Sequence, residues 1–329
     1  MPDASQPRVA VIIPVYNGEK HLADCLRHAV AAAEGLGEIV VVDDGSTDNT
    51  RAIAQQFAVK LVALPARGGP SRARNIGVEA TTAEILFFLD ADVTIPPDFI
   101  RRAIGYLDDN PDWAALFASY QRDSLPKNFC SRYKNLVHHH THQQALPEAI
   151  TFCGGYGFVR RPVFAECGGF DESLFALEDI DLGYRMHKSG HRIRLCKDLQ
   201  ASHAKYYTLR GLLISDLHHR AIPWTELMIR HRIFRADLNT GYRNVLSVPL
   251  SYLLLASLFT PTLFAVLALV FLLLNADLLR LAVSTHGMWF AARAALMHWL
   301  IYCLSGVGLM LGLSRAASQE LRSREVRPA

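Results

Sequence analysis

Two long stretches without a charged residue lie in the C-terminal part of the chain. Asn244–Ala276 contains 33 residues and Ala294–Ser314 contains 21. A helix needs about 20 apolar residues to cross the roughly 30 Å hydrocarbon core of a bilayer. Both stretches are long enough for this, so we expect a transmembrane region over residues 244–314.

Two prolines interrupt the first stretch. Pro249 and Pro261 each remove a backbone hydrogen bond from a helix, so this stretch is either one kinked helix or a tight hairpin. We expect about two spans in all, over residues 250–274 and 294–314. Two spans would place both chain ends on the same side of the membrane.

Basic residues flank this apolar region on both sides. From Lys205 to Arg243 there are seven basic and three acidic residues, and we expect residues 206–243 to form a basic amphipathic segment at the membrane interface. Residues 315–329 carry four arginines and two glutamates, which favours a basic cytosolic tail. The polar N-terminus, Met1–Arg8, has no features of a signal peptide. We therefore expect a multi-pass protein of the inner cell membrane whose first domain lies in the cytosol.

Overall charge and cysteine content exclude some classes of protein. The net charge of +3, from 34 basic and 31 acidic residues, is too balanced to suggest a nucleic-acid-binding protein. The six cysteines form no CxxC pair and have no zinc-site spacing. Scattered free thiols are typical of a reducing compartment.

The N-terminal part of the chain alternates short apolar runs with helical patterns. This alternation indicates an α/β fold with a parallel sheet and helices on both faces, and the unbroken apolar runs indicate strands buried on both sides. The predicted strands are Val9–Val15, Glu38–Val42, Val59–Leu64, Glu84–Leu89 and, later in the chain, Thr151–Val159. The predicted helices are Glu19–Ala33, Ser71–Glu79, Lys127–Gln144 and Glu178–Ser189.

Polar and acidic residues follow three of the first four predicted strands. The strand ends carry Pro14–Asn17, Asp43–Ser46 and Asp90–Asp92. In parallel sheets, ligands bind outside the carboxyl ends of the strands. We therefore expect these side chains to line one crevice.

The pair Asp90 and Asp92 has the chemistry of a metal site. Two carboxylates at a strand end can reach one Mn²⁺ or Mg²⁺ ion, which in turn can bridge the phosphates of a nucleotide. A solvated turn with helix-capping aspartates explains the pair equally well on its own. Asp44 can accept hydrogen bonds from a base or ribose, and the glycine turn Gly68–Asn75 can hold phosphate, although a plain turn fits each of these as well.

In this order, the motifs resemble glycosyltransferase family 2. The resemblance covers roughly residues 8–205 and implies a GT-A catalytic domain, a Rossmann-like fold of nucleotide-diphospho-sugar transferases, over residues 1–205. The matching segments are Val11–Asn17, Val41–Asp48, Ala73–Gly77, Phe88–Asp92, Gly168–Asp171 and Glu178–Leu182.

The resemblance assigns a donor side to the expected crevice. Asp92 would ligate the metal, and Asp90 would contact the ribose or the metal shell. Asp44 would bind the nucleobase, with uracil expected. The other residues that the family places at the donor are Pro14, Tyr16, Asn17 and Arg74.

The resemblance also implies a general base. Asp179 would take the proton of an acceptor hydroxyl, with Glu178 beside it, and a single displacement would invert the anomeric centre. Without the other motifs, a structural ion pair on an amphipathic helix would be the simpler explanation of these two acids.

The acceptor side is less well defined. Gly155 and Tyr156 are expected at the floor of the acceptor pocket, and His203 is a candidate metal ligand, although a glycine turn and a hydrogen-bonded histidine explain them as well. Trp224 stands in a segment only loosely like the Gln-x-x-Arg-Trp motif of processive members, because Pro223 replaces the arginine. The cluster His138–His142 is expected on a solvated or membrane-facing helix.

Three functions remain open from the sequence. The leading one transfers a sugar from a nucleotide donor, expected to be a UDP-sugar, to a hydroxyl of a lipid-linked or membrane-associated saccharide. The second is transfer to a polyprenyl phosphate, which is already an anion and needs no base. The third is a non-catalytic, membrane-tethered subunit that binds sugar nucleotides.

Overall fold

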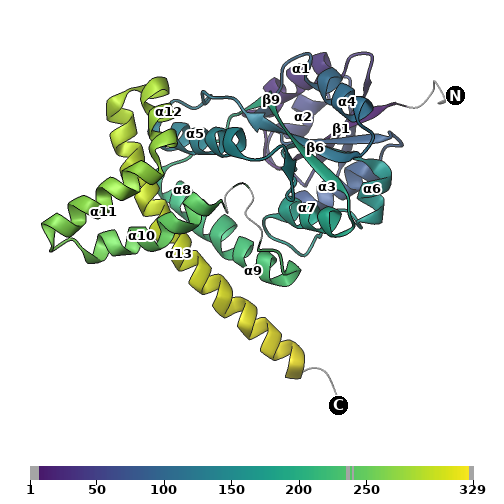
Figure 1. Cartoon of the computed structure of the whole chain (residues 1–329). Coiled ribbons are helices and arrows are strands. Elements are labelled where there is room, and N and C mark those ends of the chain that lie inside the picture. The colour runs from purple at the N-terminus through teal and green to yellow at the C-terminus, as the bar shows by residue number, and fades with distance from the viewer. Residues whose placement is uncertain (1–6, 235–237, 239–240, 326–329) are drawn as a thin grey trace. The chain divides into compact units, whose positions relative to one another are not determined.

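The computed structural model describes residues 7–234, 238 and 241–325, with side chains up to residue 318 (Figure 1). The chain divides into two compact units. Unit 1 is Met1–Pro126 with Ala145–Lys205, and unit 2 is Lys127–Gln144 with Tyr206–Ala329. The expected domain over residues 1–205 is therefore interrupted, because residues 127–144 belong to unit 2. Residues 1–6 and Arg327 of the expected tail lie outside the described residues.

Unit 1 is built on a sheet with the strand order β3-β2-β1-β4-β8-β6-β9-β5, and β7 pairs with β9. The first four strands of this order are parallel, as predicted. The strands are β1 (Val9–Val15), β2 (Gly37–Asp43), β3 (Lys60–Ala63), β4 (Ile85–Leu89), β5 (Val93–Thr94), β6 (Trp113–Tyr120), β7 (Glu148–Ala149), β8 (Tyr156–Arg160) and β9 (Arg192–His203).

Beyond the four parallel strands the sheet is mixed, and no direction was predicted for the later strand over Thr151–Val159. Strand β8 runs antiparallel to both β4 and β6. Parallel neighbours need a crossover segment, usually a helix packed on the sheet. The helix that precedes β8 in the chain, α5 (Phe129–Gln144), belongs to unit 2, so it provides no such crossover.

Helices cover both faces of the sheet in unit 1. Helices α1 and α4 pack on one face in a common apolar core, whereas α3 packs on the other face against β1 and β2. The helices of this unit are α1 (Leu22–Ala33), α2 (Thr50–Ala54), α3 (Pro70–Glu79), α4 (Phe99–Asp109), α6 (Arg161–Glu166) and α7 (Glu178–Lys188).

The register of the parallel strands brings the motif residues to one edge. Val15 lies opposite Asp43 at the ends of β1 and β2, and β4 pairs in parallel with β1 on its other side. Residues just beyond these three strand ends, including Asp44 and Asp90, therefore emerge at the same carboxyl edge.

Unit 2 is helical. The predicted span over residues 250–274 is not one helix, because α10 ends at Ala256 and Pro261 begins α11 (Figure 1). Proline is well tolerated in the first turn of a helix, where its missing N–H has no intrahelical partner. The hairpin alternative therefore describes this stretch. The other elements are α8 (Leu209–Asp216), the π-helical turn η1 (Leu217–Ala221), α9 (Ile222–His231), α10 (Tyr242–Ala256), α11 (Pro261–Leu274), α12 (Ala276–His286) and α13 (Met288–Glu325).

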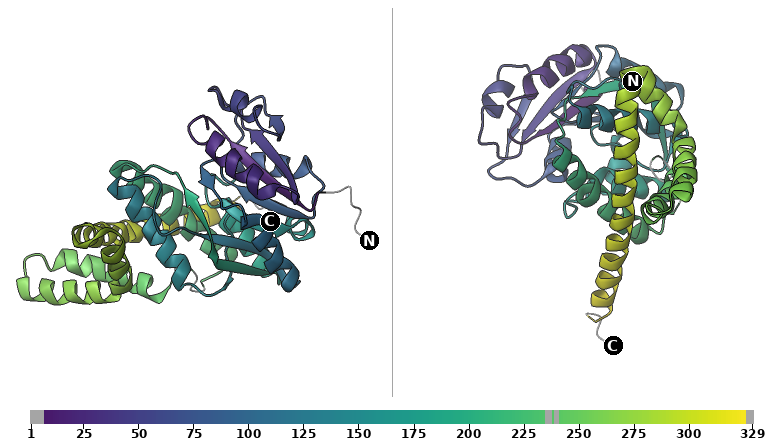
Figure 2. Two further views of the ribbon diagram at one scale, coloured as in Figure 1. Left: turned by 90° about the horizontal axis from the view of Figure 1, so that it is seen from above. Right: turned by 90° about the vertical axis from the view of Figure 1, so that its left-hand side faces the viewer.

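One described helix is long and apolar enough to cross a membrane, and a bent pair could form a second crossing. The long helix, Met288–Ser318 within α13, includes the predicted span 294–314 and is drawn in yellow in Figure 2. Helices α11 and α12 would make one broken span with a bend of 72°. At 1.5 Å per residue, the 14 residues of α11 are only about 21 Å long, which is less than the hydrocarbon thickness.

The packing of α3 on the sheet gives a test of the fold. A Cβ at Gly77 would lie 2.4 Å from Ile12 Cγ2 and 3.2 Å from Val42 Cγ2, whereas a Cβ at Gly105 in α4 would meet nothing within 4 Å. We expect Gly77→Ala to lower the free energy of unfolding by about 1–3 kcal/mol through overpacking. Gly105→Ala should raise it by up to about 1 kcal/mol through helix propensity. Thermal unfolding of the purified chain measures both, and equal melting temperatures for the two variants would contradict this packing.

Candidate active site

A cleft opens at the carboxyl edge of the parallel strands in unit 1. Its volume is about 300 Å³. Pro70 of the glycine turn also lines it, as do His21 and Arg67, to which the sequence reasoning gave no role. The predicted donor-side residues that line it are Pro14, Tyr16, Asn17, Asp44, Asp90 and Asp92.

Tyr16 and Arg67 present a flat surface at this cleft. The Arg67 guanidinium lies 4.3 Å from the centre of the Tyr16 ring, which is 40% exposed. Asn17, by contrast, makes hydrogen bonds to other residues of the protein. Its N–H donates to Ser46 Oγ at 2.9 Å, and its Oδ1 accepts from the Thr47 N–H at 2.9 Å. Asn17 thus ties the end of β1 to the turn after β2, while Tyr16 remains exposed.

Asp44 holds the glycine turn. Its two carboxylate oxygens accept hydrogen bonds from the backbone N–H groups of Gly68 at 2.7 Å and Gly69 at 2.8 Å. Asp44 is only 3% exposed. The amides that the sequence suggested for phosphate binding are therefore occupied by Asp44 in this structure. The same contacts place the start of α3 beside the cleft.

Arg74 joins two carboxylates from distant parts of unit 1. One guanidinium nitrogen donates to Asp90 Oδ1 at 2.7 Å, and another donates to Glu178 Oε1 at 2.6 Å. The Arg74 side chain is 5% exposed. Burial would lower the pKa of Arg74, but the charges of Asp90 and Glu178 outweigh it and raise this pKa. Arg74 therefore stays charged and links Asp90 of the cleft to the start of α7.

Asp179 begins the same helix and accepts only backbone hydrogen bonds among the described residues. Its oxygens accept from the Gly154 N–H at 3.0 Å and from the Ile180 N–H at 2.8 Å. Burial and the neighbouring charge of Glu178 raise the pKa of Asp179 to about 7. A carboxylate with such a pKa can accept and release a proton near neutral pH.

Two glycines allow these acids to approach one another. A Cβ at Gly154 would lie 3.3 Å from Asp179 Cβ and 3.5 Å from Arg74 Cζ. A Cβ at Gly155 would lie 2.9 Å from Asp90 Oδ2. Larger residues at either position would push against the ion pairs, so the glycine run keeps Asp90, Arg74 and Asp179 in one compact group.

Asp92 and His203 form the pair that fits a metal ion. His203 Nε2 lies 3.1 Å from Asp92 Oδ1, because β5 pairs with β9 so that Val93 lies opposite His203. Burial would raise the pKa of Asp92, but the charge and hydrogen bond of His203 lower it to about 2. Across the described residues, no group of three or more His, Cys, Asp or Glu side chains is arranged as a metal site. A carboxylate and an imidazole suit an ion that takes its remaining ligands from phosphates and water.

The comparisons with known proteins agree with this geometry. Residues 10–168 match the family model described as glycosyl transferase family 2. The chain carries a glycosyltransferase family 2 domain. The predicted family is thereby confirmed.

Two curated relatives match part of the chain. The pre-mycofactocin glycosyltransferase of Mycobacterium tuberculosis is 30% identical over 201 residues, which cover 56% of this chain and 40% of the relative. The undecaprenyl-phosphate 4-deoxy-4-formamido-L-arabinose transferase of Salmonella paratyphi A is 31% identical over 169 residues, which cover 47% of this chain and 50% of the relative. The chain thus spans half or less of the length of these relatives.

Two solved structures share the fold. The mannosyltransferase PcManGT from Pyrobaculum calidifontis, in complex with GDP-Man and Mn2+, has a TM-score of 0.55 at 23% identity, covering 98% of this chain and 89% of that one. The crystal structure of S. aureus TarS 1-349 has a TM-score of 0.51 at 18% identity, covering 91% of this chain and 90% of that one. The predicted GT-A fold class is confirmed.

The expected acceptor residues do not come together in the family 2 domain. Tyr156 is 1% exposed and packs edge-on to Tyr120, so it is a core residue and not part of a pocket floor. Trp224 lies on α9 of unit 2, where it lines a separate cavity. The histidine-rich helix α5 was expected to be solvated or membrane-facing, but His139 and His142 are both buried, so it is not a solvated helix.

Asn75 is a structural residue of the site that the sequence reasoning missed. Its Nδ2 donates to the carbonyl oxygen of Phe170 at 2.9 Å and to Glu172 Oε1 at 2.9 Å, and its Oδ1 accepts from the Phe170 N–H at 3.0 Å. Asn75 thus fixes on α3 the loop that leads toward Glu178 and Asp179. Its position beside Arg74 in a family motif was the available signal.

The raised pKa of Asp179 predicts a pH dependence of stability. The native state keeps this proton up to about pH 7, whereas the unfolded chain releases it near pH 4, so the native state loses stability as the pH rises between these values. Asp179→Asn has no proton to lose. The melting temperature of this variant minus that of the wild type should therefore be larger at pH 8 than at pH 5.

The exposed Asp112 provides the matched control. Its side chain is 77% exposed, so Asp112→Asn should change the melting temperature by the same small amount at both pH values. An Asp179→Asn difference that is equal at pH 5 and pH 8 would contradict the raised pKa.

Proposed function

We propose that the chain is an inverting glycosyltransferase that moves a sugar from a nucleoside-diphosphate donor, a UDP-sugar, to a hydroxyl of a lipid-linked or membrane-associated saccharide. The observation that carries the proposal is the position of Arg74, which bonds Asp90 of the donor cleft and Glu178 next to Asp179. This contact links the cleft proposed for the nucleotide to the carboxylate of Asp179, whose pKa is about 7. Transfer between a nucleotide sugar and a hydroxyl needs both.

The donor side would bind the nucleotide and a divalent ion. The exposed ring of Tyr16, stacked with Arg67, can receive a planar base. Asp92 and His203 would hold Mn²⁺ or Mg²⁺, which when bound neutralises the charge that develops on the departing diphosphate. The complex of PcManGT with GDP-Man and Mn2+ supports a metal and a nucleotide sugar for a protein of this fold, and a GDP-sugar is the alternative donor.

Asp179 would act as the general base. A hydroxyl acceptor loses its proton as it attacks the anomeric carbon, and a carboxylate with a pKa of about 7 can take that proton. Glu178 is bound to Arg74, so it would position the guanidinium. Its negative charge would also keep the pKa of Asp179 raised. Attack from the side opposite the diphosphate inverts the anomeric centre.

A second candidate function is transfer to a polyprenyl phosphate. The name of the Salmonella relative, an undecaprenyl-phosphate sugar transferase, favours it. A phosphate acceptor needs no base, so the raised pKa of Asp179 favours the hydroxyl acceptor. A purely sugar-nucleotide-binding subunit is less favoured, because unit 1 has both the Asp92–His203 pair and Asp179.

We also propose a multi-pass protein of the inner cell membrane with the family 2 domain in the cytosol. The apolar helix α13 and the bent pair α11 and α12 support membrane attachment. All six cysteines are free thiols, which is typical of a reducing compartment. Residues 206–243 would then lie at the membrane interface, and residues 315–325 would be part of a cytosolic tail.

Removal of the metal should weaken donor binding. In a buffer with Mn²⁺, we expect added EDTA, or the substitution Asp92→Ala, to weaken binding of a UDP-sugar to the purified chain at least tenfold, since the cation that Asp92 and His203 would hold neutralises charge on the diphosphate. Calorimetric titration measures it, with Asp98→Ala, an exposed acid on the same unit, as the control. Unchanged donor affinity in Asp92→Ala would remove the metal assignment.

The general base should determine the size of kcat and the dependence of kcat on pH. We expect kcat to rise as the pH rises through about 7, because only the deprotonated form of Asp179 accepts a proton. Asp179→Asn should lower kcat by about 10²–10⁴-fold and leave donor affinity near the wild-type value. Sugar transfer to a lipid-linked saccharide measures both. An Asp179→Asn variant with full turnover would instead support the phosphate acceptor.

A further inference from the structure

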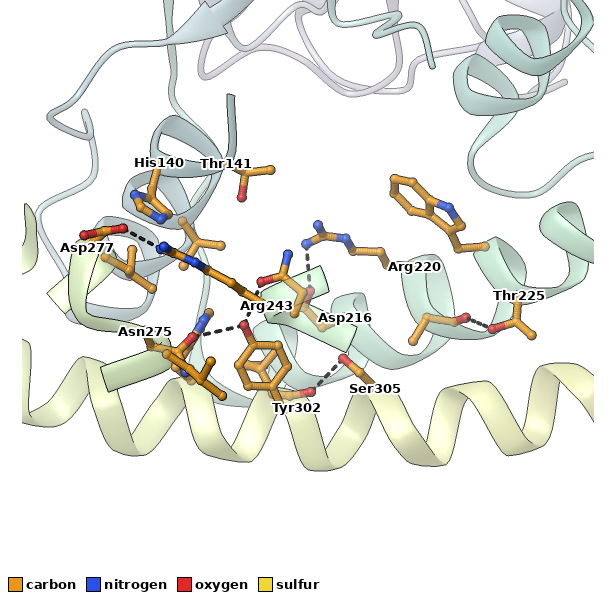
Figure 3. A pocket seen from close by; sticks show the side chains of 18 of the residues that line it. His140, Thr141, Asp216, Arg220, Thr225, Arg243, Asn275, Asp277, Tyr302 and Ser305 are labelled. Carbon is orange, nitrogen blue, oxygen red and sulfur yellow. Dashed lines mark hydrogen bonds and ion pairs between the residues drawn. The ribbon is translucent and has the colours of Figure 1, made fainter. Parts of the chain in front are cut away.

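Unit 2 contains a cavity of its own, with a volume of about 230 Å³. Helices α5, α9, α10, α12 and α13 and the turn η1 contribute to its wall (Figure 3). Apolar side chains such as Leu274, Leu278 and Ile301 make up part of the lining, and two arginines, Arg220 and Arg243, make up another part. A cavity that joins apolar walls with guanidinium groups suits an anion attached to a hydrocarbon.

Both arginines share their carboxylate partner with a second cation. Asp216 Oδ1 accepts from Arg220 at 3.3 Å and also from Lys134. Asp277 pairs with Arg243 and, at 2.8 Å, with Arg280. One carboxylate neutralises two cations incompletely, so each arginine at the cavity keeps part of its positive charge for another anion.

The guanidinium groups also have hydrogen-bonding capacity left over. A guanidinium has five N–H donors in a planar fork, which matches the oxygens of a phosphate. Among the described contacts of Arg220, one N–H goes to Asp216. Arg243 uses one donor for Asp277 and another for the hydroxyl of Tyr242. Each arginine can therefore bind a phosphate oxygen without leaving its present partner.

The same cavity contains an acceptor that no described group satisfies. Asp216 is 6% exposed, and its Oδ2 atom has no hydrogen-bond partner within the described part of the chain. A buried carboxylate oxygen without a donor is unfavourable. A ligand that carries hydroxyl groups beside its phosphate would supply the missing donor.

The surrounding helices indicate that the phosphate belongs to a lipid. The hairpin of α10 and α11 exposes large apolar side chains, with Phe259 at its turn 98% exposed and Leu273 65% exposed. Arg243 and Asp277 lie at the opposite, open end of this hairpin, where the uncharged stretch stops. Ionisable residues next to membrane-facing helices are expensive to keep and usually serve a function.

We propose that this cavity binds the phosphate-bearing head group of a membrane lipid, with Arg220 and Arg243 contacting the phosphate oxygens and the hydrocarbon lying along the apolar walls. The binding is a property of unit 2 and does not depend on sugar transfer. The additional statement that this lipid carries the acceptor saccharide rests on the proposed function.

The test is calorimetric titration of the full chain in detergent with farnesyl phosphate, farnesol or inorganic phosphate. We expect farnesyl phosphate to bind at least tenfold more tightly than either of the other two ligands. Equal affinity for farnesol would overturn the arginine contacts. Equal affinity for inorganic phosphate would overturn the lipid assignment, since the hydrocarbon would then contribute nothing.

Two arginines that share one partner provide the matched variants. Arg243 and Arg280 both pair with Asp277, but only Arg243 lines the cavity, and the Arg280 side chain is 77% exposed. Arg243→Gln should raise the Kd for farnesyl phosphate about tenfold by removing a charge-assisted hydrogen bond, and Arg280→Gln should leave it unchanged. Equal effects of the two substitutions would overturn the proposal.

Two further variants test whether a loss of lipid binding reflects misfolding and whether lipid binding is independent of catalysis. Arg220→Lys keeps a positive charge beside the buried Asp216, so it should fold, yet it should weaken binding severalfold because the planar fork is lost. Asp179→Asn should bind farnesyl phosphate as the wild type does. If the wild type and Asp179→Asn both bind farnesyl phosphate while the wild type transfers no sugar from any nucleotide donor, the proposed function is wrong and the lipid site stands.

Discussion

Arg74 is the contact on which the arrangement of the family 2 domain depends. It lies on α3, next to the sheet, and its guanidinium bonds one carboxylate at the end of β4 and another at the start of α7. The second of these, Glu178, is 104 positions away in the chain. A buried guanidinium with only one of these partners would be costly, so the two segments are held together as long as Arg74 is buried. Gly154 and Gly155 permit this closeness because they add no side chain between the acids.

Much of the domain could be predicted from its sequence, because the parallel strands are continuous apolar runs. Val9–Val15 was predicted and is observed as β1, and the acidic strand ends do line one cleft. Strand β8 could not be predicted to run antiparallel, since strand direction depends on where the preceding helix packs. The partner of Asp92 depends on the two-residue strand β5, which is too short to give a pattern. The contacts of Asp44 with Gly68 and Gly69 were missed for a similar reason: spacing does not show which ligand a backbone amide has.

In unit 2, composition predicted an apolar region but not its geometry. Pro261 begins a helix and Pro249 stays inside one, although both were equally good candidates for a kink. Packing holds the helix together after Pro249. Trp299 on α13 donates to the carbonyl oxygen of Ser251, and Tyr252 donates to that of Cys303, so the turn of α10 that follows Pro249 is fixed on α13. The ion pair of Lys134 with Asp216 is equally invisible in sequence, because it joins helices whose paired residues are 82 positions apart in the chain.

The balance of charge around Arg74 explains which acid can act as a base. One guanidinium is surrounded by three acids: Asp90 and Glu178 bond to it directly, while Asp179 accepts only backbone N–H groups. Three negative carboxylates that share one cation and have little contact with solvent repel one another strongly. One of the three therefore keeps its proton to a higher pH than a solvated carboxyl group does. Burial and the charge of Glu178 raise the pKa of Asp179 to about 7, which makes it that acid. The family resemblance predicted Asp179 as the base with Glu178 beside it, but the sequence does not show what separates two neighbouring carboxylates. Their different partners separate them, because the carboxylate that neutralises Arg74 is not available to accept a proton and the other one is.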